Sequence, residues 1–269
     1  MSRFSLNYLG IFFIIISFLS FFNIIYSYYF NLYLNIDTYI FTLFISLIIG
    51  TILLFKKKID KKITIYEKII IVIIGYILLP IIISIPYYLS IYNISLMDCY
   101  FEAISGFTST GFTIIENIKH LDESLILWRS TSQWIGGLYF LFSIVLLTDI
   151  FDNNLKKSLT NFISFNTSET FKQSFKILIL YIILTLVLFI VLNLIDIRSF
   201  DAFNLSMTII SSGGFLPVNN IEVIINSNFK EVVFSILMLT SFFSLFLSYN
   251  IIFLRKKNVN FFTEDFYLL

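Results

Sequence analysis

Charged, redox-active and metal-binding side chains are scarce in this 269-residue chain. It has one cysteine, Cys99, and one histidine, His120, so it can form no internal disulfide and offers no histidine cluster for a transition metal. Only 13% of its residues are charged, and the net charge is +1. A chain with so little excess charge has no basic surface for nucleic acid and indicates no acidic partner.

The sequence also lacks the motifs of common enzymes. It contains no Gly-x-Gly-x-x-Gly loop, no serine nucleophile elbow and no His-Glu helix motif. A membrane enzyme that uses a buried carboxylate, such as Asp98 or Glu102, is an alternative, but no converging acids, bases or metal ligands accompany these residues. We therefore expect that the chain is not an enzyme and binds no cofactor.

Apolar side chains are abundant, at 58% of the residues. A soluble domain of this length would expose far more apolar surface than water tolerates, so we expect a membrane protein surrounded by lipid. A helix needs about 20 apolar residues to cross a bilayer. By this measure we predict about six spans, at residues 8–33, 38–55, 69–89, 125–150, a fifth ending near 194, and 232–254.

The basic residues indicate how these spans are oriented. If neither polar stretch between spans crosses the membrane, 14 of the 18 Lys and Arg residues fall on one side, including the run at 56–62. Basic loops are typically cytoplasmic, so we expect both termini in the cytoplasm. The four basic residues on the other side are Lys119, Arg129, Arg198 and Lys230.

Residues 98–122 lie between two spans but are too polar to cross a bilayer. Ser95 and Asp98 have the spacing of a helix cap, which predicts a short helix from Leu96 to about Phe107. Thr-Ser-Thr-Gly follows, and such backbone at membrane depth must be buried in protein or line a watery cavity. A re-entrant pore helix with an ion filter fits this pattern, and an extramembrane turn is the alternative reading.

The same arrangement recurs later in the chain. An offset of 102 residues places Gly111 on Gly213 and Glu102 on Asn204, and it superposes span, pore helix, filter and span. The fold class we expect is therefore an all-α polytopic membrane protein with two span–pore–span repeats. Six of the nine glycines lie at pore elements: Gly106, Gly111, Gly136, Gly137, Gly213 and Gly214.

Three segments resemble a known family. Residues 102–111, Glu-Ala-Ile-Ser-Gly-Phe-Thr-Ser-Thr-Gly, and residues 127–137, Leu-Trp-Arg-Ser-Thr-Ser-Gln-Trp-Ile-Gly-Gly, resemble the Trk/Ktr/HKT superfamily of potassium and sodium uptake proteins, most closely its TrkH-type subunits. Ile-Ser-Ser-Gly-Gly-Phe at 210–215 is similar to the second filter of that family. The family closes its pore with four repeats, so the resemblance implies that this chain corresponds to the N-terminal half.

The resemblance also implies a domain division and a set of site residues. We expect a two-span extension at 1–62, repeats at 63–160 and 161–258, and at 259–269 the start of a linker to a missing third repeat. The expected potassium filter, formed by backbone carbonyls and hydroxyls, comprises Thr108, Ser109, Thr110, Gly111, Ser211, Ser212 and Gly213. The expected supporting residues are Glu102, Arg129, Gly136, Gly137 and Gly214. Glu102 and Arg129 either pair, bracing the pore helix, attract cations, or are ordinary interfacial residues.

The implied function is potassium uptake across the bacterial inner membrane, with the potassium ion as substrate. Glycine at both filter positions goes with potassium rather than sodium in the family. The implied partners are a second half-chain or a second copy that completes a four-loop pore, and a cytosolic ring of nucleotide-binding regulatory subunits. A truncated or regulatory membrane subunit without transport activity is the alternative.

Overall fold

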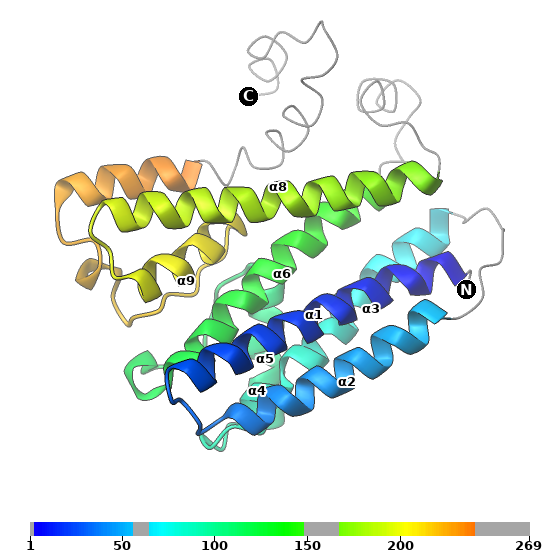
Figure 1. Ribbon diagram of the computed structural model, residues 1–269, viewed down its shortest axis with the longest axis horizontal. Helices are drawn as coiled ribbons and strands as arrows, with labels where there is room; N and C mark the ends of the chain where they lie inside the picture. The colour runs from blue at the N-terminus through cyan, green and yellow to red at the C-terminus, as the bar shows by residue number, and fades with distance from the viewer. Residues whose placement is uncertain (1–2, 56–64, 148–166, 240–269) are drawn as a thin grey trace, which may run out of the picture.

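The computed structural model describes residues 3–55, 65–147 and 167–239, and all regular structure in these ranges is helical (Figure 1). The long helices are α1 (Arg3–Tyr29), α2 (Ile36–Phe55), α3 (Ile65–Ile83), α6 (Glu123–Leu147) and α8 (Thr167–Leu194). The shorter ones are α4 (Ile85–Tyr88), α5 (Leu96–Phe107), α9 (Ser199–Ile210), the 3-10 turns η1 (Ile118–His120) and η3 (Ile221–Val223), and a helix over residues 228–239.

Among the described residues, four segments are long and apolar enough to cross a membrane. They are Asn7–Tyr29, Ile36–Phe55, Tyr66–Tyr88 and Ile177–Leu194, and they match the first, second, third and fifth predicted spans. The fourth predicted span coincides with α6, which has 25 residues but carries a polar stretch near its start. Most of the sixth span, the basic run at 56–62 and residues 259–269 lie outside the described residues, so six spans stay a prediction.

Helices α1 and α2 form a closely packed hairpin. A Cβ atom on Gly10 would lie 3.1 Å from Leu53 Cβ, and one on Gly50 would lie 3.1 Å from the Gly10 carbonyl oxygen. Small residues at such crossings let helix backbones approach, which is a common device of membrane helix pairs.

Prolines interrupt the helix of the third span near its end. α3 contains Pro80 and stops at Ile83, and α4 restarts at Ile85 with Pro86 in its first turn. Proline has no N–H to continue the helical hydrogen bonds, which accounts for the break at Ser84. Trp128 of α6 donates from Nε1 to the carbonyl of Ile83 at 3.0 Å, so a partner from another helix holds the broken end.

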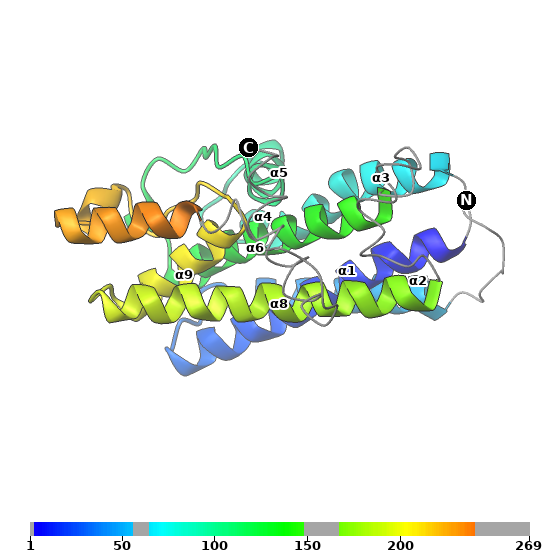
Figure 2. The same cartoon turned by 90° about the horizontal axis from the view of Figure 1, so that it is seen from above.

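Helix α6 is the centre of the structure, since it packs against α1, α3, α5, α8 and α9. Figures 1 and 2 both show it between α8 and the short helix α5. Gly136 and Gly137 permit this packing. A Cβ on Gly136 would lie 1.9 Å from the carbonyl oxygen of Phe107 at the end of α5, and one on Gly137 would lie 2.6 Å from the hydroxyl of Tyr181 in α8.

We expect Gly136→Ala to lower the melting temperature of the detergent-solubilised protein more than Gly10→Ala does. The methyl group at residue 136 would meet the Phe107 backbone at 1.9–2.7 Å, so the two helices must separate, and overpacking of this kind costs about 1–3 kcal/mol. At Gly10 the nearest atoms lie at 3.1–3.2 Å, so a shift of a few tenths of an ångström makes room for the methyl group. Equal melting temperatures for the two variants would contradict this close approach of α5 to α6.

Candidate functional site

The first candidate loop follows α5, whose start and end agree with the prediction from the sequence. Ser95 caps the helix, because its hydroxyl oxygen accepts from the Asp98 backbone N–H at 3.2 Å and its proton is donated to Asp98 Oδ2 at 2.7 Å. With 12 residues, α5 is too short to cross a bilayer. The re-entrant geometry expected for this segment is therefore consistent with its length.

The chain leaves α5 through a sharp reversal. Thr108 N donates to Ile104 O at 2.8 Å, and Thr110 N donates to Ser105 O at 3.0 Å. Ser109 between them has φ 54°, the left-handed conformation that commonly ends a helix. The Ser105 hydroxyl then donates to the carbonyl of Phe112 at 2.5 Å and holds the loop against its own helix.

The second candidate loop leaves α9 through the same set of contacts. Gly213 N donates to Thr208 O at 2.8 Å, and Ser212 has φ 54°. The Thr208 hydroxyl donates to the carbonyl of Phe215 at 3.1 Å. Two stretches with little identical sequence therefore leave their helices through the same reversal, although Gly111 has a positive φ and its equivalent Gly214 does not.

These contacts show that the predicted offset of 102 between the repeats is wrong. Ser105 corresponds to Thr208 and Ser109 to Ser212, an offset of 103 that also relates α5 to α9 and η1 to η3. Gly111 consequently corresponds to Gly214 rather than Gly213. The sequence misled because two adjacent glycines allow either register, whereas the hydroxyl bonds to the loop carbonyls allow one.

The two loops meet at this pair of glycines. A Cβ on Gly111 would lie 2.6 Å from the Cα of Gly214, and a Cβ on Gly214 would lie 3.1 Å from the Cα of Gly111. Gly111 also has φ 80°, which strains any other residue. The equivalent positions of the two repeats thus touch backbone to backbone, with no side chain between them.

The predicted filter residues differ in their surroundings. Thr108, Thr110 and Ser212 are exposed, and Ser109, Gly111 and Gly213 are half-buried. Ser211 is buried, and its hydroxyl donates to Met207 O and Thr208 O at 2.9 and 3.0 Å, which makes it part of the end of α9. Gly214, predicted as a supporting residue, is exposed at the meeting point.

Glu102 and Arg129 form a buried ion pair, as one of the sequence interpretations proposed. Arg129 Nε lies 2.9 Å from Glu102 Oε1, and both side chains are 1% exposed. The Thr113 hydroxyl donates to the Glu102 carboxylate at 3.0 Å, accepts from Arg129 at 3.1 Å, and the Ile114 N–H donates to Glu102 Oε2 at 3.2 Å. This carboxylate is neutralised and fully engaged, so it holds the end of the first loop rather than attracting cations.

Arg129 also contacts the second loop. Its guanidinium lies 4.3 Å from the ring centroid of Phe215, and Nη1 is 3.5 Å from the carbonyl oxygen of Leu216. A cation–π contact of this kind is favourable, and the attraction is stronger when the two groups are buried. One side chain of α6 therefore touches both candidate loops.

Several of these residues were absent from the site predicted from the sequence. The missed residues are Thr113, which bonds to Glu102, Phe215, which lies against Arg129, and Gln133, which contacts the second loop. Gln133 and Phe215 lie within the segments that resemble the family. The available signal was the spacing of Arg129 and Gln133, four positions apart on one helical face of α6.

A second ion pair lies at the start of α9. Arg198, the residue before the helix, forms an ion pair with Glu123 of α6, and this hydrogen bond raises the pKa of Arg198 above its ordinary value. The contact ties the N-terminal ends of α6 and α9 together.

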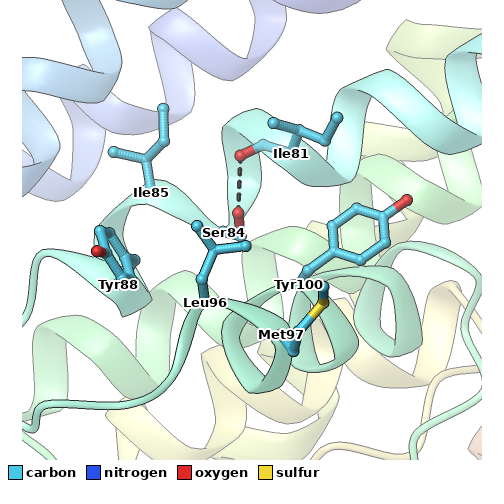
Figure 3. Close-up of a pocket in the computed structure, with 7 residues that line it drawn as sticks. All are labelled: Ile81, Ser84, Ile85, Tyr88, Leu96, Met97 and Tyr100. Atoms are coloured by element: carbon cyan, nitrogen blue, oxygen red, sulfur yellow. Dashed lines mark hydrogen bonds between the residues drawn. The ribbon is translucent and has the colours of Figure 1, made fainter.

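A separate pocket of about 430 Å³ lies at the break between α3 and α4 (Figure 3). The residues that line it are Ile81, Ser84, Ile85, Tyr88, Leu96, Met97 and Tyr100. None of them is charged, and the Ser84 hydroxyl is engaged with the Ile81 carbonyl at 2.8 Å. Within the described residues no group of three or more His, Cys, Asp or Glu side chains could hold a metal ion.

No protein-family model matches the chain. It is 34% identical over 164 residues to an uncharacterized cation transporter of Methanocaldococcus jannaschii. The aligned region covers 58% of this chain and 33% of that protein. It is 25% identical over 140 residues to the Trk system potassium uptake protein TrkH of Escherichia coli. This alignment covers 46% of this chain and 27% of that protein.

A solved structure matches over a longer range. The crystal structure of the potassium transporter TrkH from Vibrio parahaemolyticus aligns with a TM-score of 0.70 at 21% identity, and covers 90% of this chain but 51% of the TrkH chain. The chain thus spans about half the length of that transporter, which fits the expected N-terminal half. The chain is thus similar in sequence to Trk-type cation uptake proteins and similar in fold to about half of one TrkH chain.

Proposed function

We propose that this chain forms half of the ion pathway of a membrane potassium uptake protein. Its TrkH relatives are named potassium uptake proteins, and its fold is that of about half a TrkH chain. In this proposal, the loops at Gly111 and Gly214 are two of four filter loops. Their backbone carbonyls replace the water around a potassium ion, as rings of carbonyls do in potassium-selective pores.

The contact between Gly111 and Gly214 carries the proposal. Two short helices end in the same left-handed reversal, at Ser109 and Ser212, and the loops that follow meet at glycines without intervening side chains. Such a meeting allows carbonyl oxygens from both loops to face a common axis. The C-terminal ends of α5 and α9 also lie beside the loops, and their partial negative charge favours a cation, although water weakens this effect.

The offset of 103 refines the proposed filter. Ser109 to Gly111 and Ser212 to Gly214 present the coordinating oxygens, Gly214 is the second filter glycine, and Thr108 and Ser211 are the C-cap residues of α5 and α9. Glycine at both central positions supports potassium as the ion, in line with the family resemblance.

Two loops do not close a ring, so we propose that another chain or a second copy supplies the remaining two. Phe112 and Phe215 occupy equivalent positions, yet Phe112 is 70% exposed and Phe215 is 1% exposed beneath Arg129. The second loop is covered by the first repeat, and the first loop has no such cover among the described residues. A partner that packs on Phe112 would bury it as α6 buries Phe215.

We also propose a cellular location, an orientation in the membrane and a regulatory partner. We place the protein in the plasma membrane with both termini in the cytoplasm, and we retain the repeats at 63–160 and 161–258. A cytosolic nucleotide-binding ring would contact the basic loops near 56–62 and 153–176.

We expect a potassium-uptake-deficient bacterium to regain growth and rubidium uptake when it expresses the active assembly. The chain is expressed alone and with the reading frame that follows it. Within the rescuing assembly, Gly111→Val and Gly214→Val should each lower uptake at least about tenfold, because either side chain forces the loops apart. At Gly111, whose φ is 80°, backbone strain adds about 1–3 kcal/mol. Gly10→Ala, in the α1–α2 hairpin, is the control.

Rubidium uptake that survives in the Gly111→Val/Gly214→Val double variant would refute the filter assignment. If neither expression restores growth while the protein is present in the membrane, the chain is a truncated or regulatory subunit.

We expect Arg129→Met to destabilise the detergent-solubilised protein by about 3–5 kcal/mol, because it leaves the Glu102 carboxylate buried and unpaired. The double variant Glu102→Met/Arg129→Met removes both charges, so its loss should be smaller than the sum of the two single losses. The Arg198–Glu123 pair is the control, since these side chains are 64% and 32% exposed and Arg198→Met should cost about 0–1 kcal/mol. Strictly additive losses at Glu102 and Arg129 would contradict the bracing role.

A further inference from the structure

Gln133 is a buried polar side chain of α6 that lies one helical turn beyond Arg129. It is 0% exposed. A Cβ on Gly213 would lie 2.4–2.6 Å from the three atoms of its amide group, so the amide rests directly on the second loop. A buried amide must find partners for its donors and its acceptor, and these partners determine what it does.

Thr208 fixes which way the amide is turned. The Thr208 hydroxyl donates its proton to the Phe215 carbonyl at 3.1 Å, so it accepts from Gln133, whose amide end lies 3.0 Å away. With the amide nitrogen there, the Gln133 oxygen lies 2.9 Å from the backbone nitrogens of both Gly214 and Phe215 and accepts from both. The reverse orientation would place the amide N–H groups against two further donors.

These two hydrogen bonds determine the direction of the loop carbonyls. In a trans peptide, the N–H of one residue and the C=O of the residue before it point in opposite directions. The N–H groups of Gly214 and Phe215 point to Gln133, so the carbonyls of Gly213 and Gly214 point away from α6, toward the open side of the loop.

We infer that Gln133 is the positioning residue of the second filter loop and, through the directions of the Gly213 and Gly214 carbonyls, a determinant of which cation passes. This inference rests on the proposed function. Gln133 does for the second loop what Glu102 does for the first, where the carboxylate accepts from the Ile114 N–H. A neutral amide suits its place, since it donates to Thr208 and adds no unpaired charge.

Hydrogen exchange of the purified full chain tests the positioning role without any need for transport. In Gln133→Leu, the Gly214 and Phe215 amides lose their acceptor, so a peptide covering 209–218 should exchange at least about tenfold faster at these two sites. Thr131→Val is the matched control, because the Thr131 hydroxyl is buried on the same helix and donates to Trp128 O within that helix. Unchanged exchange in Gln133→Leu would overturn the inference.

If Gln133→Leu does not fold, Gln133→Met replaces it. This variant keeps the length of the side chain but removes the amide oxygen that accepts from the Gly214 and Phe215 N–H groups. The same peptide should then exchange faster at these two sites, and unchanged exchange would again overturn the inference.

Transport selectivity tests the second part of the inference in whichever assembly takes up rubidium. Gln133→Leu should lower the ratio of rubidium to sodium uptake about fivefold, roughly the effect of one hydrogen bond, whereas Thr131→Val should leave the ratio unchanged. An unchanged ratio in Gln133→Leu would remove Gln133 as a selectivity determinant, whereas a wild-type assembly without rubidium uptake would instead count against the proposed function.

Discussion

Non-helical backbone between membrane helices must find its hydrogen-bond partners inside the protein, because hydrocarbon offers none. Both candidate loops meet this requirement by bonding to their own helix and to one neighbour. Ser105 and Thr208 bond the loop carbonyls from within each repeat, and α6 supplies the long-range contacts through Arg129 and Gln133. The polar face of α6 is therefore a structural requirement of the loops, and it explains why this long helix is less apolar than its neighbours.

Close approach is the second requirement, and glycine meets it at each contact. Gly136 admits the end of α5 and Gly137 admits α8, so α6 reaches both repeats. Gly111 and Gly214 then let the loops touch. A methyl group at any of these contacts would displace backbone or a packed side chain, which links the helix packing directly to the geometry of the loops.

The sequence predicted those features that depend on short-range rules. The spacing of Ser95 and Asp98 located α5 because a helix cap involves residues three apart, and the length of the apolar segments located four of the spans. The offset between the repeats was wrong, because the bonds that fix it depend on how each loop folds back on its helix. Gln133 was overlooked as a loop contact, since its role follows only once α6 is known to pass beside both loops.

Arg129 connects the two loops energetically as well as in space. Its guanidinium is bonded to Glu102 and Thr113 on the side of the first loop and lies on Phe215 on the side of the second. A movement of α6 therefore cannot shift one loop and leave the other in place. The two loops therefore form one preorganised unit whose geometry α6 sets.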